Sequence, residues 1–208
     1  LTSYLCHPQM ANHELGGPIA LCYLYNLLKK TGPHKYTYRF LICPENIGAA
    51  AFLQNSGKIV DKVIDAGFIL NCLGYGEEWV LKKSRRKNSF SDLLAKNALS
   101  SSELPLTIVD FFPDGSDERQ FCSPGYNWPV SLVMRKMYGT FKQYHTSADN
   151  LDLVSNQGLE GSLQVLKNII DSFELGLYPK LLTKCEPQLG KRNLYPNISR
   201  FTKKNVLE

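Results

Sequence analysis

The sequence predicts an α/β fold with three layers (αβα), in which helices cover both faces of a mainly parallel, mixed central sheet. Two observations lead to this prediction. Strand-like apolar runs alternate along the chain with helix-like runs, and polar residues follow directly after several of these strands. With 208 residues, of which 43% are hydrophobic, the chain is long enough to bury one full core.

The composition divides the chain into two regions. Residues 1–176 carry the predicted strands and helices and should form one domain, whereas residues 177–208 are rich in Pro, Lys and Asn and should be a C-terminal extension or a linker to an absent domain. The chain does not begin with Met, and its first residues already resemble an interior strand. We therefore expect a fragment of a longer protein whose N-terminal part is missing.

The first half of the chain predicts strands and helices in alternation. Thr2–Cys6 is a strand-like run, and Pro18–Lys30 is typical of a buried helix because it begins with Pro, stays almost wholly apolar and ends before Gly32-Pro33. Tyr36–Cys43 alternates and then becomes continuously apolar, as a central strand does. A second apolar helix is expected over Ala49–Leu53.

The second half repeats this alternation. A short helix is expected over Ser91–Leu99, with Ser91 or Ser89 as its N-cap. Leu159–Leu175 has apolar residues near helical spacing and should cover one face of the sheet. Three further runs have the composition of strands: Gly67–Leu73, Leu106–Phe111 and Val130–Met134.

Composition also argues against several classes of partner. The net charge of +5 is mild, and the basic run 82–87 is best interpreted as a solvated loop because no aromatic ladder accompanies it. No stretch approaches the roughly 18 uncharged apolar residues of a membrane span. The six cysteines form no C-x-x-C pair and mostly lie inside apolar runs, as reduced thiols do. We expect a cytoplasmic protein with no nucleic-acid or membrane partner.

Four polar residues each follow a predicted strand: His7, Glu45, Asp117 and His145. Because the carboxyl ends of parallel strands lie along one edge of an open sheet, these side chains should converge on one site. His13 lies on the same short loop as His7, ahead of the first helix. The convergence of several loops is a stronger signal than any single motif.

Imidazoles combined with carboxylates are the components of a hydrolytic metal site. Catalytic zinc binds histidine nitrogen and lowers the pKa of a bound water to about 7, and a nearby carboxylate then accepts its proton. Glu45 fits this base, although it also fits a carboxylate at a helix N-terminus, and Asp117 equally fits a helix cap. A cysteine nucleophile is disfavoured because Cys6 and His7, as neighbours in a strand, would point to opposite faces.

Several segments resemble the clan MH metallopeptidases, the zinc aminopeptidases and glutaminyl cyclases. His145–Asp152 resembles their last zinc-ligand motif, in which a histidine precedes Thr and then an Asp. Ser116-Asp117 is similar to their Ser-Asp-His segment, and Glu45-Asn46-Ile47-Gly48 is similar to their Glu-Glu-x-Gly, whose first Glu is the base. Leu15-Gly16-Gly17 resembles the stretch after their bridging aspartate.

A closer resemblance is to a bacterial aminopeptidase-like domain family associated with polysaccharide biosynthesis. It is carried by Cys-His-Pro, the Met-Ala-Asn loop, Pro-Glu-x-Ile-Gly, Gly-Ser-Asp-Glu-Arg-Gln and Cys-Glu-Pro-Gln-Leu-Gly-Lys-Arg, which span most of residues 1–196. The resemblance implies a zinc aminopeptidase fold of the phosphorylase/hydrolase-like type. It also implies a peptide or small aminoacyl substrate.

The chain departs from the clan at three acidic positions. The bridging aspartate falls on His13, the second glutamate becomes Asn46, and the remaining aspartate ligand falls near Cys72. The carboxylates that hold a second metal are therefore missing. This predicts a mononuclear, histidine-rich site with one zinc ion.

The resulting hypothesis is a zinc-dependent, aminopeptidase-type hydrolase that cleaves a peptide or amide bond. His7, His13 and His145 would hold the zinc ion and Glu45 would be the general base. Asp117 would orient a ligand or bind the substrate amine. The alternative is a catalytically inactive peptidase-like domain that binds or scaffolds components of polysaccharide biosynthesis.

Overall fold

A six-stranded sheet with the strand order β2-β1-β3-β6-β4-β5 forms the centre of the structure, a computed structural model that describes residues 1–176, 182–185 and 188–195. Its strands are β1 (Thr2–Tyr4), β2 (Leu41–Cys43), β3 (Gly67–Leu70), β4 (Trp79–Lys82), β5 (Leu106–Val109) and β6 (Val130–Met134). The chain divides into two units, Leu1–Leu177 and Tyr178–Glu208. The described part of the second unit contains a short 3-10 helix, Leu189–Arg192.

The sheet is mixed, as predicted. Strands β1, β2, β3 and β6 run parallel to one another. Strand β4 is antiparallel to β6, and β5 is parallel to β4, so these two strands run against the other four. The direction expected for the predicted strand Leu106–Phe111 therefore needs correction, because β5 runs against β1, β2, β3 and β6.

Strand β4 lies where the sequence predicted the start of a solvated basic loop. Lys82 is its last residue and is only 1% exposed, so the loop prediction is wrong at this position. The reason lies in the preceding apolar run Trp79–Leu81, which pairs with β5 and β6 and carries Lys82 into the interior.

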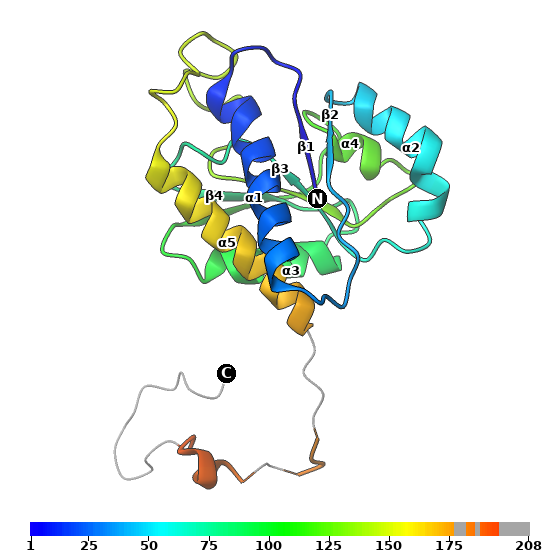
Figure 1. Ribbon diagram of the computed structural model, residues 1–208, viewed down its shortest axis with the longest axis vertical. Helices are drawn as coiled ribbons and strands as arrows, with labels where there is room; N and C mark the ends of the chain where they lie inside the picture. The colour runs from blue at the N-terminus through cyan, green and yellow to red at the C-terminus, as the bar shows by residue number, and fades with distance from the viewer. Residues whose placement is uncertain (177–181, 186–187, 196–208) are drawn as a thin grey trace. The chain divides into compact units, whose positions relative to one another are not determined.

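Helices cover both faces of the sheet, which confirms the three-layer fold (Figure 1). Helices α1, α3 and α5 share one core cluster, which includes Leu24, Leu94 and Ile169. Helices α2 and α4 share the other cluster, which includes Leu53 and Phe121. The helices are α1 (Gly16–Thr31), α2 (Ile47–Val60), α3 (Phe90–Ser100), α4 (Glu118–Phe121) and α5 (Asn156–Leu175), preceded by a π-helix, η1 (Ala11–Leu15).

Element boundaries differ from the predictions in places that packing explains. Only the last three residues of Tyr36–Cys43 form strand β2, because β1 beside it offers only three pairing residues. Tyr36 packs against the α1–α5 core instead. Helix α2 continues to Val60, beyond the predicted end at Leu53, because Gly57 and Val60 are buried on the same helix.

Close packing places the start of α1 directly over the sheet. A Cβ atom on Gly17 would collide with the carbonyl oxygen of Leu70 and the hydroxyl of Ser3, so only glycine permits this approach. The N-cap of α3 is Ser89, whose hydroxyl accepts a hydrogen bond from the amide of Asp92. Among the described residues, no helix combines the length and the apolar composition needed to cross a membrane.

Candidate functional site

The loop after β1 carries the first site residues. Strand β1 ends at Tyr4, earlier than the predicted Cys6, and irregular chain leads from there to the π-helix η1. Single π-helical turns occur frequently at functional sites. Here the turn places His13 and Glu14 in positions that are 2% and 1% exposed.

Three histidines from two distant segments meet at the carboxyl edge of β1 and β6. The ring centroids are 4.8 Å apart for His7 and His13, 4.8 Å for His7 and His145, and 5.0 Å for His13 and His145. One nitrogen of each ring lies within 4.8 Å of the other two. The structure therefore brings together the three residues predicted as metal ligands. His145 is exposed, so the cluster opens to solvent on that side.

Glu14 supports the cluster, although the sequence prediction assigned no role to this carboxylate of the His7–His13 loop. Its Oε1 lies 2.6 Å from Nδ1 of His7, and its Oε2 accepts a hydrogen bond of 2.7 Å from the amide of Cys6. A carboxylate on one ring nitrogen fixes the orientation of a histidine and leaves the other nitrogen for a metal. The signal in the sequence was a glutamate directly after His13, on a turn whose π-helical geometry the local pattern does not reveal.

Cys6 lies beside His7, contrary to the expectation that the two would diverge. Its Sγ is 3.2 Å from His7 Nδ1, because the strand has already ended and the alternation of side chains no longer applies. Burial, outweighing a backbone hydrogen bond, raises the pKa of the Cys6 thiol. The thiol is therefore not activated as a nucleophile.

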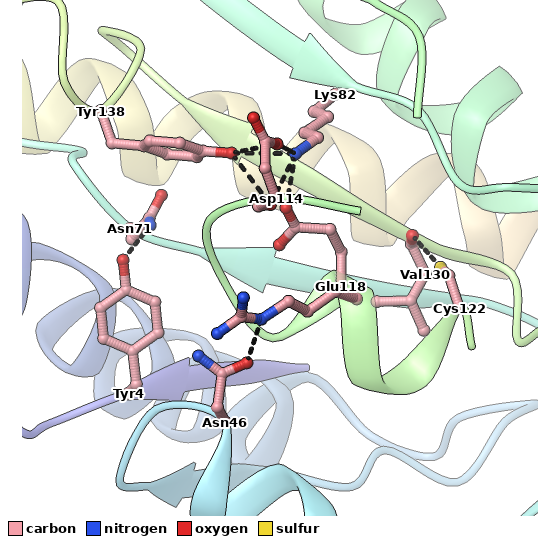
Figure 2. Close-up of polar contacts among 10 residues, drawn as sticks. Tyr4, Asn46, Asn71, Lys82, Asp114, Glu118, Cys122, Val130 and Tyr138 are labelled. Atoms are coloured by element: carbon pink, nitrogen blue, oxygen red, sulfur yellow. Dashed lines mark hydrogen bonds and ion pairs between the residues drawn. The ribbon is translucent and has the colours of Figure 1, made fainter. Parts of the chain in front are cut away.

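His13 is held by a buried hydrogen-bond network at one of its two nitrogens. Its Nε2 lies 2.9 Å from the hydroxyl of Tyr4, which also receives a hydrogen bond from the side-chain amide of Asn71 (Figure 2). Its Nδ1 is buried and has no hydrogen-bond partner among the described residues. Burial, together with the nearby His7 and His145, lowers the pKa of His13 to about 3, so the ring is neutral.

Asp149 joins the two segments that carry the histidines. Its Oδ1 accepts a hydrogen bond of 2.7 Å from the amide of Asn12, and its Oδ2 accepts one of 3.1 Å from the amide of His13. Its own carbonyl oxygen accepts a third, of 3.0 Å, from the amide of Ala11. The carboxylate is fully buried and caps the start of η1, four positions after His145 in the sequence.

The ring of Tyr144 sets the orientation of His145. The two rings stack with centroids 3.9 Å apart and an interplanar angle of 14°, and Tyr144 also meets His13 edge-on at 5.0 Å. His145 itself has a φ of 56°, in the left-handed region, which turns its side chain back toward the cluster.

Glu45 follows β2 on a tight turn next to this cluster. The amide of Ile47 donates a 2.6 Å hydrogen bond to the carbonyl oxygen of Glu45, which closes a γ-turn centred on Asn46 with a φ of 58°. Burial, followed by the charge of Asp117, raises the pKa of Glu45 to about 7. Glu45 is therefore a carboxyl group that changes its protonation state near neutral pH.

Asp117 lies against the turn that carries Glu45. Its Oδ1 accepts a 2.6 Å hydrogen bond from the amide of Asn46, and its Oδ2 is buried without a partner among the described residues. Burial raises the pKa of Asp117 to about 6. Asp117 is the residue before α4 and makes no side-chain cap hydrogen bond, so its carboxylate serves the turn at Asn46.

The route by which Asp117 reaches this edge differs from the prediction. Because β5 runs against β1, β2 and β6, the carboxyl end of β5 lies at the opposite edge of the sheet. Residues 110–117, here called the return segment, lead the chain back to Asn46. The prediction that Asp117 joins the site was made for a parallel strand, and that reason is wrong.

The donor set fits a single metal ion of the zinc type. His13 offers a buried nitrogen with no other partner, and the two other imidazoles are neighbours at the same point. The clan's remaining aspartate ligand was expected near Cys72. Asn71 and Cys72 are both buried there, and the side-chain amide of Asn71 donates a hydrogen bond to the hydroxyl of Tyr4. Residues 67–72 contain no Asp or Glu, so this strand offers no carboxylate ligand for a second metal.

A profile of the family described as a domain of unknown function (DUF4910) matches residues 1–175. A protein of Clostridium acetobutylicum, whose name couples polysaccharide biosynthesis with an aminopeptidase-like domain, is 41% identical over 200 residues, covering 95% of this chain and 45% of that protein. This chain thus spans about half the length of that relative.

Solved structures share the fold. A crystal structure of a candidate peptidase from Clostridium acetobutylicum is 40% identical, with a TM-score of 0.83 over 92% of this chain and 45% of that one. A zinc aminopeptidase from Bacillus subtilis is 15% identical, with a TM-score of 0.70 over 83% of this chain and 45% of that one. The second likeness concerns the fold alone. Together they confirm the predicted aminopeptidase-like α/β architecture.

Proposed function

This chain belongs to the DUF4910 family, and we propose that it is a zinc-dependent, aminopeptidase-type hydrolase that cleaves a peptide or amide bond. His7, His13 and His145 hold one zinc ion, Glu45 is the general base, and the substrate is a peptide or a small aminoacyl compound. The reaction class is supported by the aminopeptidase-like name of the relative and by the fold shared with a zinc aminopeptidase.

The observation that carries the proposal is the unpartnered Nδ1 of His13. A buried polar atom without a partner costs about 1–3 kcal/mol, and native proteins rarely keep one without a use. This nitrogen lies in a cluster where His7 and His145 each bring a nitrogen within 4.8 Å. A bound cation satisfies all three imidazoles at once.

Zinc at this position would polarise a carbonyl group and lower the pKa of a water molecule. Glu45 is suited to accept the proton of that water, because burial and Asp117 raise its pKa to about 7, close to working pH. The γ-turn at Asn46 fixes the backbone from which Glu45 projects. Glu45 can then transfer the proton to the leaving amine.

Asp117 is assigned to the substrate amine. Its Oδ1 is already engaged by the amide of Asn46, and its buried Oδ2 has no partner among the described residues. An ammonium group placed between Asp117 and Glu45 would satisfy that oxygen and bring the adjacent amide bond toward the histidine cluster. This arrangement favours substrates with a free amino group.

The test combines metal content with turnover. Protein purified without added metal is assayed by elemental analysis and then against a panel of aminoacyl p-nitroanilides and dipeptides. Glu45→Gln should keep its metal and lose roughly 10²–10⁴ of the turnover number. The exposed Glu160→Gln on α5 is the matched control and should behave as the unmodified protein. Absence of bound metal, or full turnover in Glu45→Gln on a verified substrate, contradicts the proposal.

A second candidate is a non-catalytic domain that binds or scaffolds components of polysaccharide biosynthesis. It is favoured by one observation, the replacement of acidic ligands by His13, Asn46 and Asn71-Cys72. The name of the curated relative points to the same process. Stoichiometric metal without hydrolysis of any substrate in the panel would favour this function over the enzyme.

A further inference from the structure

The return segment, residues 110–117, needs something other than a strand to hold it. It lies between β5 and α4 and contains neither helix nor strand. Yet it must place Asp117 within 2.6 Å of the amide of Asn46, at the edge of the sheet opposite to the one where β5 ends. An irregular segment of this length keeps one conformation only where side chains fix it.

A buried ammonium group provides these contacts (Figure 2). Lys82 Nζ donates hydrogen bonds to Asp114 Oδ1 at 2.7 Å, to the carbonyl oxygen of Asp114 at 3.0 Å, and to Glu118 Oε1 at 2.7 Å. It also donates one to the hydroxyl of Tyr138 at 2.9 Å. These four residues, Lys82, Asp114, Glu118 and Tyr138, are called the Lys82 clamp below.

The clamp grips the return segment on both sides of Asp117. Asp114 precedes Asp117 by three positions and Glu118 follows it directly. Lys82 and Glu118 are each 1% exposed, so neither charge can be hydrated if the other moves away. Removing one partner of a buried pair is strongly unfavourable, which confines the segment to this arrangement.

The aromatic ring of Tyr138 completes the clamp from the chain that leads to Tyr144 and His145. Lys82 Nζ lies 5.6 Å from the centre of that ring. Gly115, with a φ of 77°, passes so close that a Cβ atom there would collide with the hydroxyl end of Tyr138. The return segment is thus held between the ammonium group and the ring.

The far end of the segment sets the turn that aims Glu45. Asn46 has a φ of 58°, and three side chains from residues 117–120 hold it in this conformation. The carboxylate of Asp117 accepts from its amide, while Arg119 Nε at 2.8 Å and the side-chain amide of Gln120 at 3.2 Å donate to its Oδ1. All three residues lie in the return segment or in α4, directly after it.

We propose that Lys82 is a positioning residue, which clamps the return segment so that Asp117 holds the Asn46 γ-turn and thereby places the Glu45 carboxylate beside the histidine cluster. This inference rests on the proposed function for the role of Glu45. Its structural content, the dependence of the Asn46 turn on Lys82, stands without any assumption about metal or substrate.

The test reads the Asn46 turn directly by NMR hydrogen exchange on the full chain. Lys82→Met removes the ammonium group and keeps most of the side-chain length. Lys82→Met alone would leave the carboxylate of Glu118 buried and unpaired. The double variant Lys82→Met/Glu118→Gln also removes that charge, so it should still fold. Gly115→Ala perturbs the clamp at Tyr138 without altering any charge. Lys167→Met is the matched control, because Lys167 pairs with Asp171 within helix α5 and touches no residue of the return segment.

In the clamp variants the amide of Asn46 should exchange at least about tenfold faster, while the amides of Ile69 and Leu132 in the central strands change by less than about twofold. Lys167→Met should leave all three amides unchanged. Unchanged protection of Asn46 in the folded double variant and in Gly115→Ala would overturn the inference.

The same variants separate this inference from the proposed function. If Asn46 is released and the unmodified protein neither binds metal nor hydrolyses the panel, the positioning role stands and the hydrolase proposal fails. If hydrolysis is established, the double variant should lower kcat and raise KM, because release of the return segment displaces both the base Glu45 and the amine-binding Asp117.

Discussion

The hydroxyl of Tyr4 lies 2.9 Å from Nε2 of His13, at the last position of the first strand. This contact occupies one nitrogen of a fully buried imidazole and leaves Nδ1 as the only nitrogen that can bind a metal. Tyr4 also receives the side-chain amide of Asn71, so the network anchors His13 to β1 and to the end of β3. Strand β1 and the histidine cluster are thus joined in one hydrogen-bonded network.

Tyr4→Phe removes this anchor without changing the shape of the core. We expect the affinity for zinc to fall about 10–100-fold, the range seen when a group that supports a ligand histidine is lost. Calorimetric titration of the metal-free protein measures the change. The control is Tyr126→Phe, which removes a hydrogen bond of 3.0 Å to the carbonyl oxygen of Leu53 away from the histidines and should leave zinc affinity unaltered.

His7→Ala and His145→Ala should each abolish stoichiometric zinc. Each substitution leaves two imidazoles in the cluster, fewer than the three protein ligands of catalytic zinc sites. Elemental analysis should find about one equivalent in the unmodified protein and a small fraction of that in either variant. His34→Ala, at a histidine bonded to the carbonyl oxygen of Leu28, should retain its metal. Undiminished zinc in both site variants would show that the ion is held elsewhere.

His13 decides how many metals the site admits. His13→Ala should weaken zinc binding far more than the 10–100-fold of a supporting residue, because it removes a ligand. His13→Asp restores a carboxylate, and we expect it to keep the first ion and to take up a second at raised zinc concentration. The number of equivalents in a calorimetric titration distinguishes these outcomes. Two tight equivalents in the unmodified protein would contradict the mononuclear site.

Asp149→Asn should destabilise the fold by about 1.5–3 kcal/mol, because the negative charge is lost where η1 begins and the NH2 group of Asn cannot accept one of the two amide hydrogen bonds. Asp152→Asn on the same loop is the control. Its side chain is exposed, and its replacement should change the free energy of unfolding by less than about 0.5 kcal/mol. Urea unfolding of the metal-free proteins measures both values. Equal stability of the two variants would show that Asp149 does not hold η1.

Glu45→Gln should make the metal-free protein more stable at pH 8. In the folded chain the pKa of Glu45 is raised from 4.5 to about 7. Between these two pH values the folded protein therefore keeps a proton on Glu45 that the unfolded protein has already released. Stability of the unmodified protein therefore falls as pH rises from about 4.5 to about 7. The variant avoids this loss, which is of order 2 kcal/mol after allowance for partial exposure. Urea midpoints at pH 4.5 and pH 8 test it: the advantage should vanish at the lower pH.

Much of the fold could be predicted because local patterns and global packing agree. The helix at Pro18 begins at Gly16 and ends at Thr31, as Pro near its start and Gly32-Pro33 after its end indicate. Strand β6 has the predicted bounds, Val130–Met134, because it is buried on both faces and continuously apolar. Strand β4 was missed because a charged residue closes it, and only the tertiary clamp makes burial of Lys82 tolerable.

The site was accessible to sequence reasoning only in part. His7, Glu45 and His145 follow parallel strands, and the strand-end rule applies to them. It does not apply to Asp117, whose strand runs the other way. The roles of Tyr4, Glu14 and Asp149 depend on a π-helical turn and on contacts between distant segments, which no local periodicity encodes.

The hydrogen bond between Asn12 and Asp149 spans 137 positions of the chain. Loops of this length close late in folding, because the chain loses conformational entropy on closure before the contact stabilises the fold. The first two imidazoles are synthesised and exit the ribosome long before the third, and the backbone of His13 is not fixed by Asp149 until that residue arrives. A zinc ion that needs all three would stabilise only the completed domain. Metal loading would then be a step that follows folding, which would make bound zinc a direct marker of correctly folded protein.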